Sequence, residues 1–346
     1  MTATSSHRFV VGLIGFAVLV FGLMVGKAIL LPFVAAIVIW YLIYTLAMSF
    51  RQVPMVGKKL PYWMTMMLSF AVIFIALWLF SQLVSSNISQ LIAVVPSYHE
   101  RLIAIFAQIQ ELLHVKDPMA FDEIFQDLNL TAAMTGLAAA IAELARDAVV
   151  ILLYVLFLLM EQHLFTSKMR RMIKDPGKYE TTRKLIDRIS SQIQSYLKIK
   201  SLVSLVTALI SYAILLMIGV DFAGFWAVLI FFLNFIPTIG SIMATFLPML
   251  LTLVQFDSFT PFFLVAISLI SIQFLIGNII EPKLMGKSFN LSPLVILLSL
   301  AFWGTIWGVL GMFLCVPIMV IGIIILSNFE STWPIAVALS ENGDIK

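Results

Sequence analysis

The chain has 346 residues, of which 62% are hydrophobic and only 11% are charged, and its formal net charge is +3 at pH 7. Soluble domains carry about 25% charged residues, and a soluble globule of this composition would leave too much apolar surface in water. Only helices and closed barrels satisfy the backbone inside a bilayer. The apolar runs do not alternate as barrel strands do, so we predict an all-α, polytopic transmembrane helical bundle.

The apolar runs have lengths near or above the roughly 20 residues that a spanning helix needs. The first follows Arg8, and because a second run begins at once we interpret it as a spanning helix rather than a signal peptide. In chain order the runs are Phe9–Gly26, Ala28–Phe50, Tyr62–Ser85, Ala148–Phe165, Ser201–Ile218, Phe222–Val254, Pro261–Ile280 and Pro293–Leu326. Residues 1–85 are therefore expected to hold three transmembrane helices, and 148–165 a fourth.

Two polar stretches separate these runs and predict the orientation. Residues 86–147 carry three basic and eight acidic side chains, whereas 166–200 carry ten basic and three acidic ones. Both contain helical apolar stripes, which in the second stretch are Leu185, Ile189, Ile193 and Leu197. Because short loops rich in Lys and Arg stay in the cytoplasm, we expect 86–147 outside, 166–200 inside, and the N-terminus inside.

Other classes of site are disfavoured by the same residues. The basic stretch lacks a nucleic-acid-binding motif, so we expect no nucleic-acid partner and interpret its charge as a topology signal with some attraction to anionic lipid. The single Cys315 and four scattered histidines show no metal-ligand spacing. The segment Met285-Gly286-Lys287-Ser288 lacks the first glycine of a phosphate-binding loop. We therefore predict no metal, no cofactor and no enzyme activity.

The run Phe222–Val254 is too long for one ordinary helix and is interrupted at its centre by Asn234-Phe235-Ile236-Pro237-Thr238-Ile239-Gly240-Ser241. Pro237 disfavours helix at and before its position, and Gly240 permits a tight turn. We predict two half-helices, the second beginning near Ser241, with Thr238 and Ser241 as candidate caps.

The run Pro293–Leu326 has a parallel design. Its break is Phe302-Trp303-Gly304-Thr305-Ile306-Trp307-Gly308, and in both runs a proline follows the break, Pro248 or Pro317. Together they suggest a repeated unit of helix plus broken hairpin over 201–330, which we interpret as a transport core followed by a cytoplasmic tail at 331–346. Paired interrupted segments indicate a transporter's substrate site, although mere kinks or loops between short helices are the alternative.

A polar helix face lies between the two breaks. Gln273, Gly277 and Glu281 follow one another at four-residue spacing, with Asn278 beside them. Polar groups at membrane depth are expensive and usually functional. Glu281 could bind a cation or carry a proton, or it could be an interfacial residue paired with Lys283 or Lys287, and the pattern leaves both open.

At these residues the chain resembles the autoinducer-2 exporter family. The matching stretches are the Asn234–Ser241 segment, Gly277-Asn278-Ile279-Ile280-Glu281-Pro282-Lys283-Leu284-Met285-Gly286, and Leu291-Ser292-Pro293-Leu294 through Phe302-Trp303-Gly304 to Val316-Pro317. The resemblance implies a secondary transporter of the bacterial inner membrane with both ends cytoplasmic, and a homopentamer. Family members are linked to export of autoinducer-2, and others to sodium or lithium exchange for protons.

Three functions follow as hypotheses. The first is export of a small polar signalling molecule, autoinducer-2, for whose uncharged hydroxyl groups the polar residues at the breaks are suited. The second is sodium (lithium)/proton antiport through Glu281, and the third is a non-transporting membrane scaffold. The candidate substrate-binding residues are Asn234, Pro237, Thr238, Gly240, Ser241, Gln273, Asn278, Trp303, Thr305 and Gly308, and the candidate coupling residue is Glu281.

Overall fold

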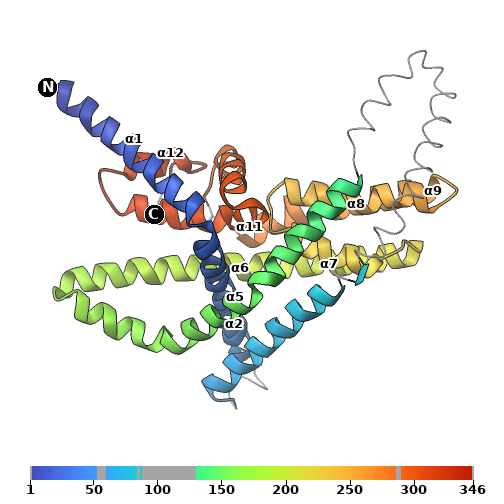
Figure 1. The fold of residues 1–346 in the computed structure, drawn as a ribbon, viewed down its shortest axis with the longest axis horizontal. Coiled ribbons are helices and arrows are strands. Elements are labelled where there is room, and N and C mark those ends of the chain that lie inside the picture. The colour runs from blue at the N-terminus through green and yellow to red at the C-terminus, as the bar shows by residue number, and fades with distance from the viewer. Residues whose placement is uncertain (1, 53–59, 84–85, 88–129, 286–289, 345–346) are drawn as a thin grey trace. The chain divides into compact units, whose positions relative to one another are not determined.

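The computed structural model describes residues 2–52, 60–83, 86–87, 130–285 and 290–344, and every regular element among them is a helix (Figure 1). Six helices in these ranges are long and apolar enough to cross a membrane. Many large apolar side chains are exposed on them, including Ile29, Phe157 and Ile267, because lipid rather than water is their solvent. The predicted all-α polytopic bundle is confirmed.

The helices belong to two compact units. One unit consists of 1–45, 147–196 and 287–346, and the other of 46–146 and 197–286. We call these the terminal unit and the central unit. The helices that span the boundaries are α2 (Lys27–Gln52), α5 (Leu130–Met172) and α6 (Pro176–Ile218).

The predicted basic loop is built almost entirely from two long helices. The helix α5 continues without interruption from the apolar run to Met172, and α6 begins at Pro176 and runs into the next apolar run. The Asp175 carboxylate accepts hydrogen bonds from the amides of Gly177 (2.8 Å) and Lys178 (3.2 Å), which satisfies free N–H groups at the start of α6. The predicted apolar stripe is confirmed as a buried or half-buried helix face. Most of the acidic segment, 88–129, lies outside the described residues.

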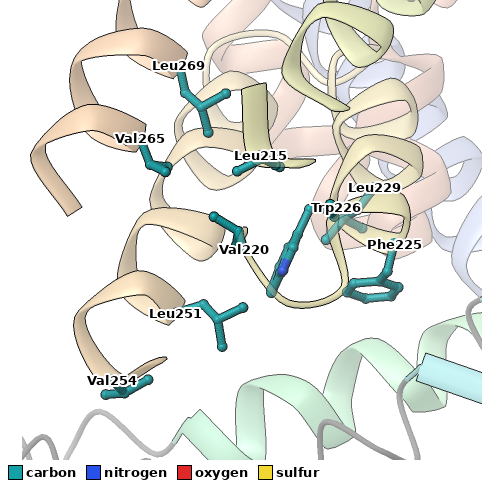
Figure 2. Close-up of a cluster of buried hydrophobic side chains, with 10 residues drawn as sticks. Leu215, Val220, Phe225, Trp226, Leu229, Leu251, Val254, Val265 and Leu269 are labelled. Atoms are coloured by element: carbon teal, nitrogen blue, oxygen red, sulfur yellow. The ribbon is translucent and has the colours of Figure 1, made fainter. Parts of the chain in front are cut away.

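The first interrupted run forms a helical hairpin in the central unit. Its arms are α7 (Ala223–Leu233) and α8 (Ile239–Gln255), which pack against each other. Figure 2 shows Leu251 and Val254 of α8 directed toward the same buried cluster as Trp226 of α7. At the open end, the Gln255 amide donates to the Gly219 carbonyl (2.8 Å) and accepts from the Asp221 N–H (2.9 Å). The end of α8 therefore lies beside the residues that lead from α6 into the hairpin.

The second interrupted run, α11 (Pro293–Ser327), also folds back on itself, within the terminal unit. Gly308 has φ 64° and ψ −143°, which is not helical. The Ser299 hydroxyl donates to the Cys315 carbonyl across the break at 3.4 Å. In an uninterrupted helix those residues would lie about 24 Å apart, so the halves of α11 form a second hairpin.

The remaining packing of the terminal unit surrounds this second hairpin. Leu31 of α2 forms a buried cluster with Ile306, Trp307 and Leu314, and the Trp307 indole donates to the Leu23 carbonyl of α1 (Thr2–Val25) at 3.2 Å. The C-terminal residues predicted as a tail contain a helix, α12 (Trp333–Leu339), which contacts α11. The start of α11 and the chain terminus are thereby held in one unit.

Candidate functional site

The tip of the α7–α8 hairpin contains a strained turn. Thr238 has φ 57° and ψ −63°, and the Ile239 N–H donates to the Pro237 carbonyl at 2.5 Å. This three-residue γ-turn with a left-handed central residue is rare, and such strain in a residue other than glycine is concentrated at functional sites. The second half-helix begins at Ile239, slightly earlier than predicted. Thr238 occupies the N-cap position but its side chain makes no capping bond, contrary to the predicted role.

Gly240 allows the two arms of this hairpin to meet at the tip. A Cβ at this position would lie 1.8 Å from the Leu233 carbonyl oxygen and 3.0 Å from the Ile236 Cβ. The requirement for glycine is therefore steric, because the first turn of α8 approaches the backbone at the end of α7. Ser241 uses its hydroxyl locally, donating to the Thr238 carbonyl at 2.8 Å. The predicted cap residue thus stabilises the turn from its C-terminal side.

Two predicted substrate-binding side chains meet at this tip. Asn234 follows α7 and is buried. Its side-chain oxygen Oδ1 accepts a hydrogen bond from the side-chain amide of Gln273 at 3.2 Å. Gln273 belongs to α9 (Thr260–Leu275), so this bond joins the hairpin tip to the middle of the next spanning helix. Buried amides carry several donors and acceptors, and one mutual bond uses only part of this capacity. The pair can also hydrogen-bond a polar ligand.

The helix that carries Gln273 changes its winding before Glu281. A π-helical turn, η1 (Ile276–Ile280), separates α9 from α10 (Glu281–Met285). A π-turn adds about one residue to a turn, so Gln273 and Glu281 are aligned about as residues seven apart in an α-helix. Both are partly buried, whereas Gly277 and Asn278 are exposed. The four residues predicted to share one polar helix face are therefore separated. Gln273 and Glu281 lie on a partly buried face, and Asn278 does not lie on it.

Glu281 forms an ion pair with Lys200 of α6, and the ammonium donates a hydrogen bond to the carboxylate. The side chains are only 10% exposed for Lys200 and 17% for Glu281. The interfacial alternative had placed Lys283 or Lys287 opposite this carboxylate. Lys283 is exposed, and residue 287 lies outside the described residues. The partner is thus a residue that sequence reasoning did not select.

Lys200 begins a buried polar stripe on α6, which continues through Ser204, Thr207 and Ser211. This stripe was missed, although its spacing of three and four residues inside an otherwise apolar run is the signal that could have revealed it. Small polar residues also let membrane helices approach closely, so packing is part of its role.

The stripe and the polar residues of α9–α10 run along neighbouring antiparallel helices. Lys200 pairs with Glu281, while Leu215 of α6 shares a buried cluster with Leu269 of α9. Counting along the helices from the Lys200–Glu281 pair puts Ser204 near the level of Gly277, and Thr207 near the level of Gln273. We call the set Lys200, Ser204, Thr207, Gln273, Glu281 and Asn234 the polar column.

The second hairpin repeats the glycine packing of the first with a shifted register. A Cβ on Gly311 would lie 1.9 Å from the Trp303 carbonyl oxygen and 3.0 Å from the Trp307 Cβ. This matches the environment of Gly240, so Gly311, not Gly308, is its steric counterpart. Gly308 instead supplies the left-handed turn residue, and no atom lies within 4 Å of a Cβ built there. Separate glycines therefore make the turn and the close approach.

The other predicted residues of this hairpin have local partners. Trp303 is half-buried, with its ring centroid 5.0 Å from that of Trp307. Thr305 is exposed and its hydroxyl donates to the Ala301 carbonyl at 2.8 Å. Trp303, Thr305 and Gly308 belong to the terminal unit and the other candidates to the central unit. A single site shared by both hairpins stays a prediction.

Comparison with known proteins places the chain in a family. A family model described as AI-2E family transporter matches residues 13–331. The AI-2 transport protein TqsA of Escherichia coli K12 is 31% identical over 324 residues, which cover 92% of each chain. The chain belongs to the AI-2E transporter family.

Two further relatives agree with this assignment. A putative transport protein of Haemophilus influenzae is 28% identical over 347 residues, covering 98% of each chain. A putative transport protein of Borreliella burgdorferi is 43% identical over 183 residues, covering 52% of this chain and 50% of that protein. This AI-2E family member is therefore a multi-pass membrane transporter, and its relatives are named for transport rather than for enzyme activity.

Proposed function

We propose that this transporter exports a small polar signalling molecule, with autoinducer-2 as the leading candidate. The observation that carries the proposal is the Asn234–Gln273 hydrogen bond, which links a strained hairpin tip to the middle of a spanning helix. Irregular backbone at membrane depth persists where it is buried in protein or lines a cavity. TqsA is named an AI-2 transport protein, and we extend that substrate to this chain as part of the proposal.

We infer that such a substrate would move along the polar column of the central unit. Asn234 and Gln273 offer amide groups to hydroxyl-bearing molecules, and Ser204 and Thr207 continue the polar surface along α6 toward Lys200 and Glu281. Trp303, Thr305 and Gly308 of the second hairpin belong to the same proposal as candidate substrate-binding residues. Substrate binding between two interrupted segments is the arrangement typical of secondary transporters.

Export from cells that lack their own autoinducer-2 exporter tests this function. We expect the wild-type chain to lower the intracellular signal. The Gln273→Leu variant should lose about tenfold of the efflux rate, because it removes the bond to Asn234 and leaves a buried amide unpaired. Gln52→Leu, at an exposed position at the end of α2, is the matched control. Efflux that is unchanged by expression of the wild-type chain would refute the proposal.

The buried Lys200–Glu281 pair favours cation/proton antiport as a second candidate. A carboxylate that exchanges its ammonium partner for a proton or a sodium ion could couple transport to an ion gradient. Glu281→Gln should then abolish sodium efflux from vesicles loaded with sodium. A wild-type rate in this variant would exclude Glu281 as the coupling acid.

A non-transporting scaffold is the third candidate. Leucine substitution at Gly240 cannot distinguish it from a transporter, because the added side chain would collide with the Leu233 carbonyl and disrupt the hairpin itself. Gln273→Leu is the better test, since it leaves the close backbone contact intact. A scaffold should keep its cellular effect in this variant, whereas a transporter should not.

We also propose that the protein lies in the inner membrane with both termini cytoplasmic. The hairpin fold supports this orientation, because a hairpin returns the chain to the side it came from, which puts Lys283 on the same side as the basic start of α6. The homopentamer implied by the family resemblance belongs to the same proposal, and the mass of the purified complex in lipid discs would test it.

A further inference from the structure

Lys200 differs from the other basic residues of α6. Lys178, Lys184 and Lys198 are exposed, whereas Lys200 is buried and lies where the apolar run begins. A buried ammonium is retained only where an anion or several acceptors satisfy it. In this structure the anion is the carboxylate of Glu281.

A second donor lies one helical turn beyond Lys200. Ser204 is on the same face of α6, is 0% exposed, and its hydroxyl has no hydrogen-bond partner among the described residues. A buried hydroxyl without a partner is unfavourable, and Ser and Thr in helices usually bond to their own backbone, as Thr207 does to the Val203 carbonyl at 2.8 Å. The Ser204 hydroxyl is therefore available to a ligand.

We propose that Lys200 and Ser204 form a binding position for an anionic oxygen group of the transported molecule, a position that the Glu281 carboxylate occupies in this structure. An ammonium and a hydroxyl one turn apart provide donors to two oxygens of a carboxylate or a phosphate. Glu281 reaches Lys200 but does not satisfy Ser204. A free oxyanion that bridged Lys200 and Ser204 would satisfy both donors.

This inference rests on the proposed transport function and adds an anionic class of substrate to the uncharged signal proposed above. The amides at the hairpin tip suit an uncharged polyhydroxyl molecule, but an uncharged ligand that displaced Glu281 would leave the Lys200 ammonium without a counter-ion. A ligand with hydroxyl groups and one carboxylate or phosphate satisfies the whole polar column. Exchange of this ligand for Glu281 would also release the carboxylate for a coupling proton or cation.

Binding to the purified full chain in discs of neutral lipid tests the site without requiring transport. The probes are inorganic phosphate and acetate, with glycerol as the uncharged comparator. Glu281→Gln removes the competing charge and should lower the Kd for phosphate or acetate about tenfold relative to wild type. Lys200→Met should abolish saturable binding, and Lys200→Arg should retain it. Glycerol binding should not change in any variant.

Ser204→Ala should weaken oxyanion binding several-fold in the Glu281→Gln background. Ser69→Ala is the matched control, because Ser69 is a buried serine of the same unit whose hydroxyl already donates to the Thr65 carbonyl at 2.8 Å. If Glu281→Gln does not fold, Glu281→Asp, which shortens the competitor by one methylene, should give a smaller gain in affinity.

Equal oxyanion affinity in the Glu281→Gln and Lys200→Met variants would overturn the inference, as would Ser204→Ala with undiminished affinity. Failure of the transport proposal has a different signature. In that case the binding differences would persist, while cells with and without the wild-type chain would retain equal amounts of autoinducer-2.

Discussion

At the residue scale, the hairpin tips depend on glycines that touch backbone rather than on glycines that merely bend it. Gly240 and Gly311 approach the carbonyl oxygens of Leu233 and Trp303 so closely that no side chain fits. Gly308 has open space around it but a backbone conformation that other residues rarely adopt. The sequence singled out Gly240 and Gly308 but not Gly311, because it shows where glycines occur but not which backbone atoms pack against them.

The first prediction concerns these close contacts. Gly311→Ala should lower the unfolding temperature and the yield of folded protein, because its Cβ would overlap the Trp303 carbonyl and force the second hairpin apart. Gly322→Ala in the same α11 helix is the matched control, since no atom lies within 4 Å of its added Cβ. Alanine there should stabilise the helix by up to about 1 kcal/mol. Equal melting temperatures for both variants would contradict the steric argument.

The pairing of Glu281 is also decided at the residue scale. Lys283 is two residues away in sequence, but residues two apart do not face each other on a helix. Lys200 is remote in sequence and lies on a neighbouring antiparallel helix, where burial strengthens the attraction. Sequence reasoning singled out the acid, and only the ion pair between α6 and α10 identified the base.

At the element scale, both interrupted runs are hairpins rather than kinked spans. The arms of the first are about 16 and 25 Å long, and each is shorter than the roughly 30 Å hydrocarbon core of a bilayer. The open end of the first is tied by Gln255 to Gly219 and Asp221. In the second, the Ser299–Cys315 bond joins the arms. Half-helices that meet within the membrane follow from these lengths.

The second prediction tests the hairpin in α11 with the chain's single native cysteine. Ser299→Cys should form an intrachain disulfide with Cys315 under a membrane-permeant oxidant, because the two residues are neighbours across the hairpin. A disulfide requires Cα atoms within about 7 Å, which an uninterrupted helix would not allow at this separation. The measurement is the intact mass together with thiol labelling after denaturation.

Leu298→Cys is the control for that cross-link, because Leu298 is adjacent in sequence but exposed on another face of the helix. It should leave both thiols free. Free thiols in the oxidised Ser299→Cys protein as well would argue for a kinked but continuous span.

At the scale of the whole molecule, the side of the membrane on which each later connection lies depends on whether the interrupted runs fold back. Apolar length alone would let the run Phe222–Val254 cross once as a long broken span, which would move Lys283 to the outside. A hairpin instead leaves the α8–α9 connection on the side where α6 ends. The orientation that we propose from the basic start of α6 would then extend to the C-terminal half as well.

The third prediction tests this orientation by labelling single cysteines in a Cys315→Ala background. Ser258→Cys, between α8 and α9, should react with an impermeant maleimide added to intact spheroplasts, because this exposed connection is expected outside. Lys178→Cys, near the exposed start of α6, should react only after the membrane is permeabilised. The reverse pattern would invert the proposed topology, and labelling of both from outside would refute the hairpin interpretation of the first run.

The sequence by itself determined the fold class, the positions of the helices and the two breaks, because apolar length and Pro/Gly placement act locally along the chain. It also singled out Asn234, Gln273 and Glu281, since polar groups are conspicuous within apolar runs. The repeat of helix plus broken hairpin was likewise visible, although its register was not.

Only the tertiary structure decided which of these groups meet. The Asn234–Gln273 bond, the Lys200–Glu281 pair and the unpartnered Ser204 hydroxyl each depend on how one helix lies against another. The π-turn before Glu281 matters for the same reason, because one extra residue rotates every side chain that follows it. Spacing along a single helix cannot report these contacts, since they arise from the register between helices that are distant in sequence.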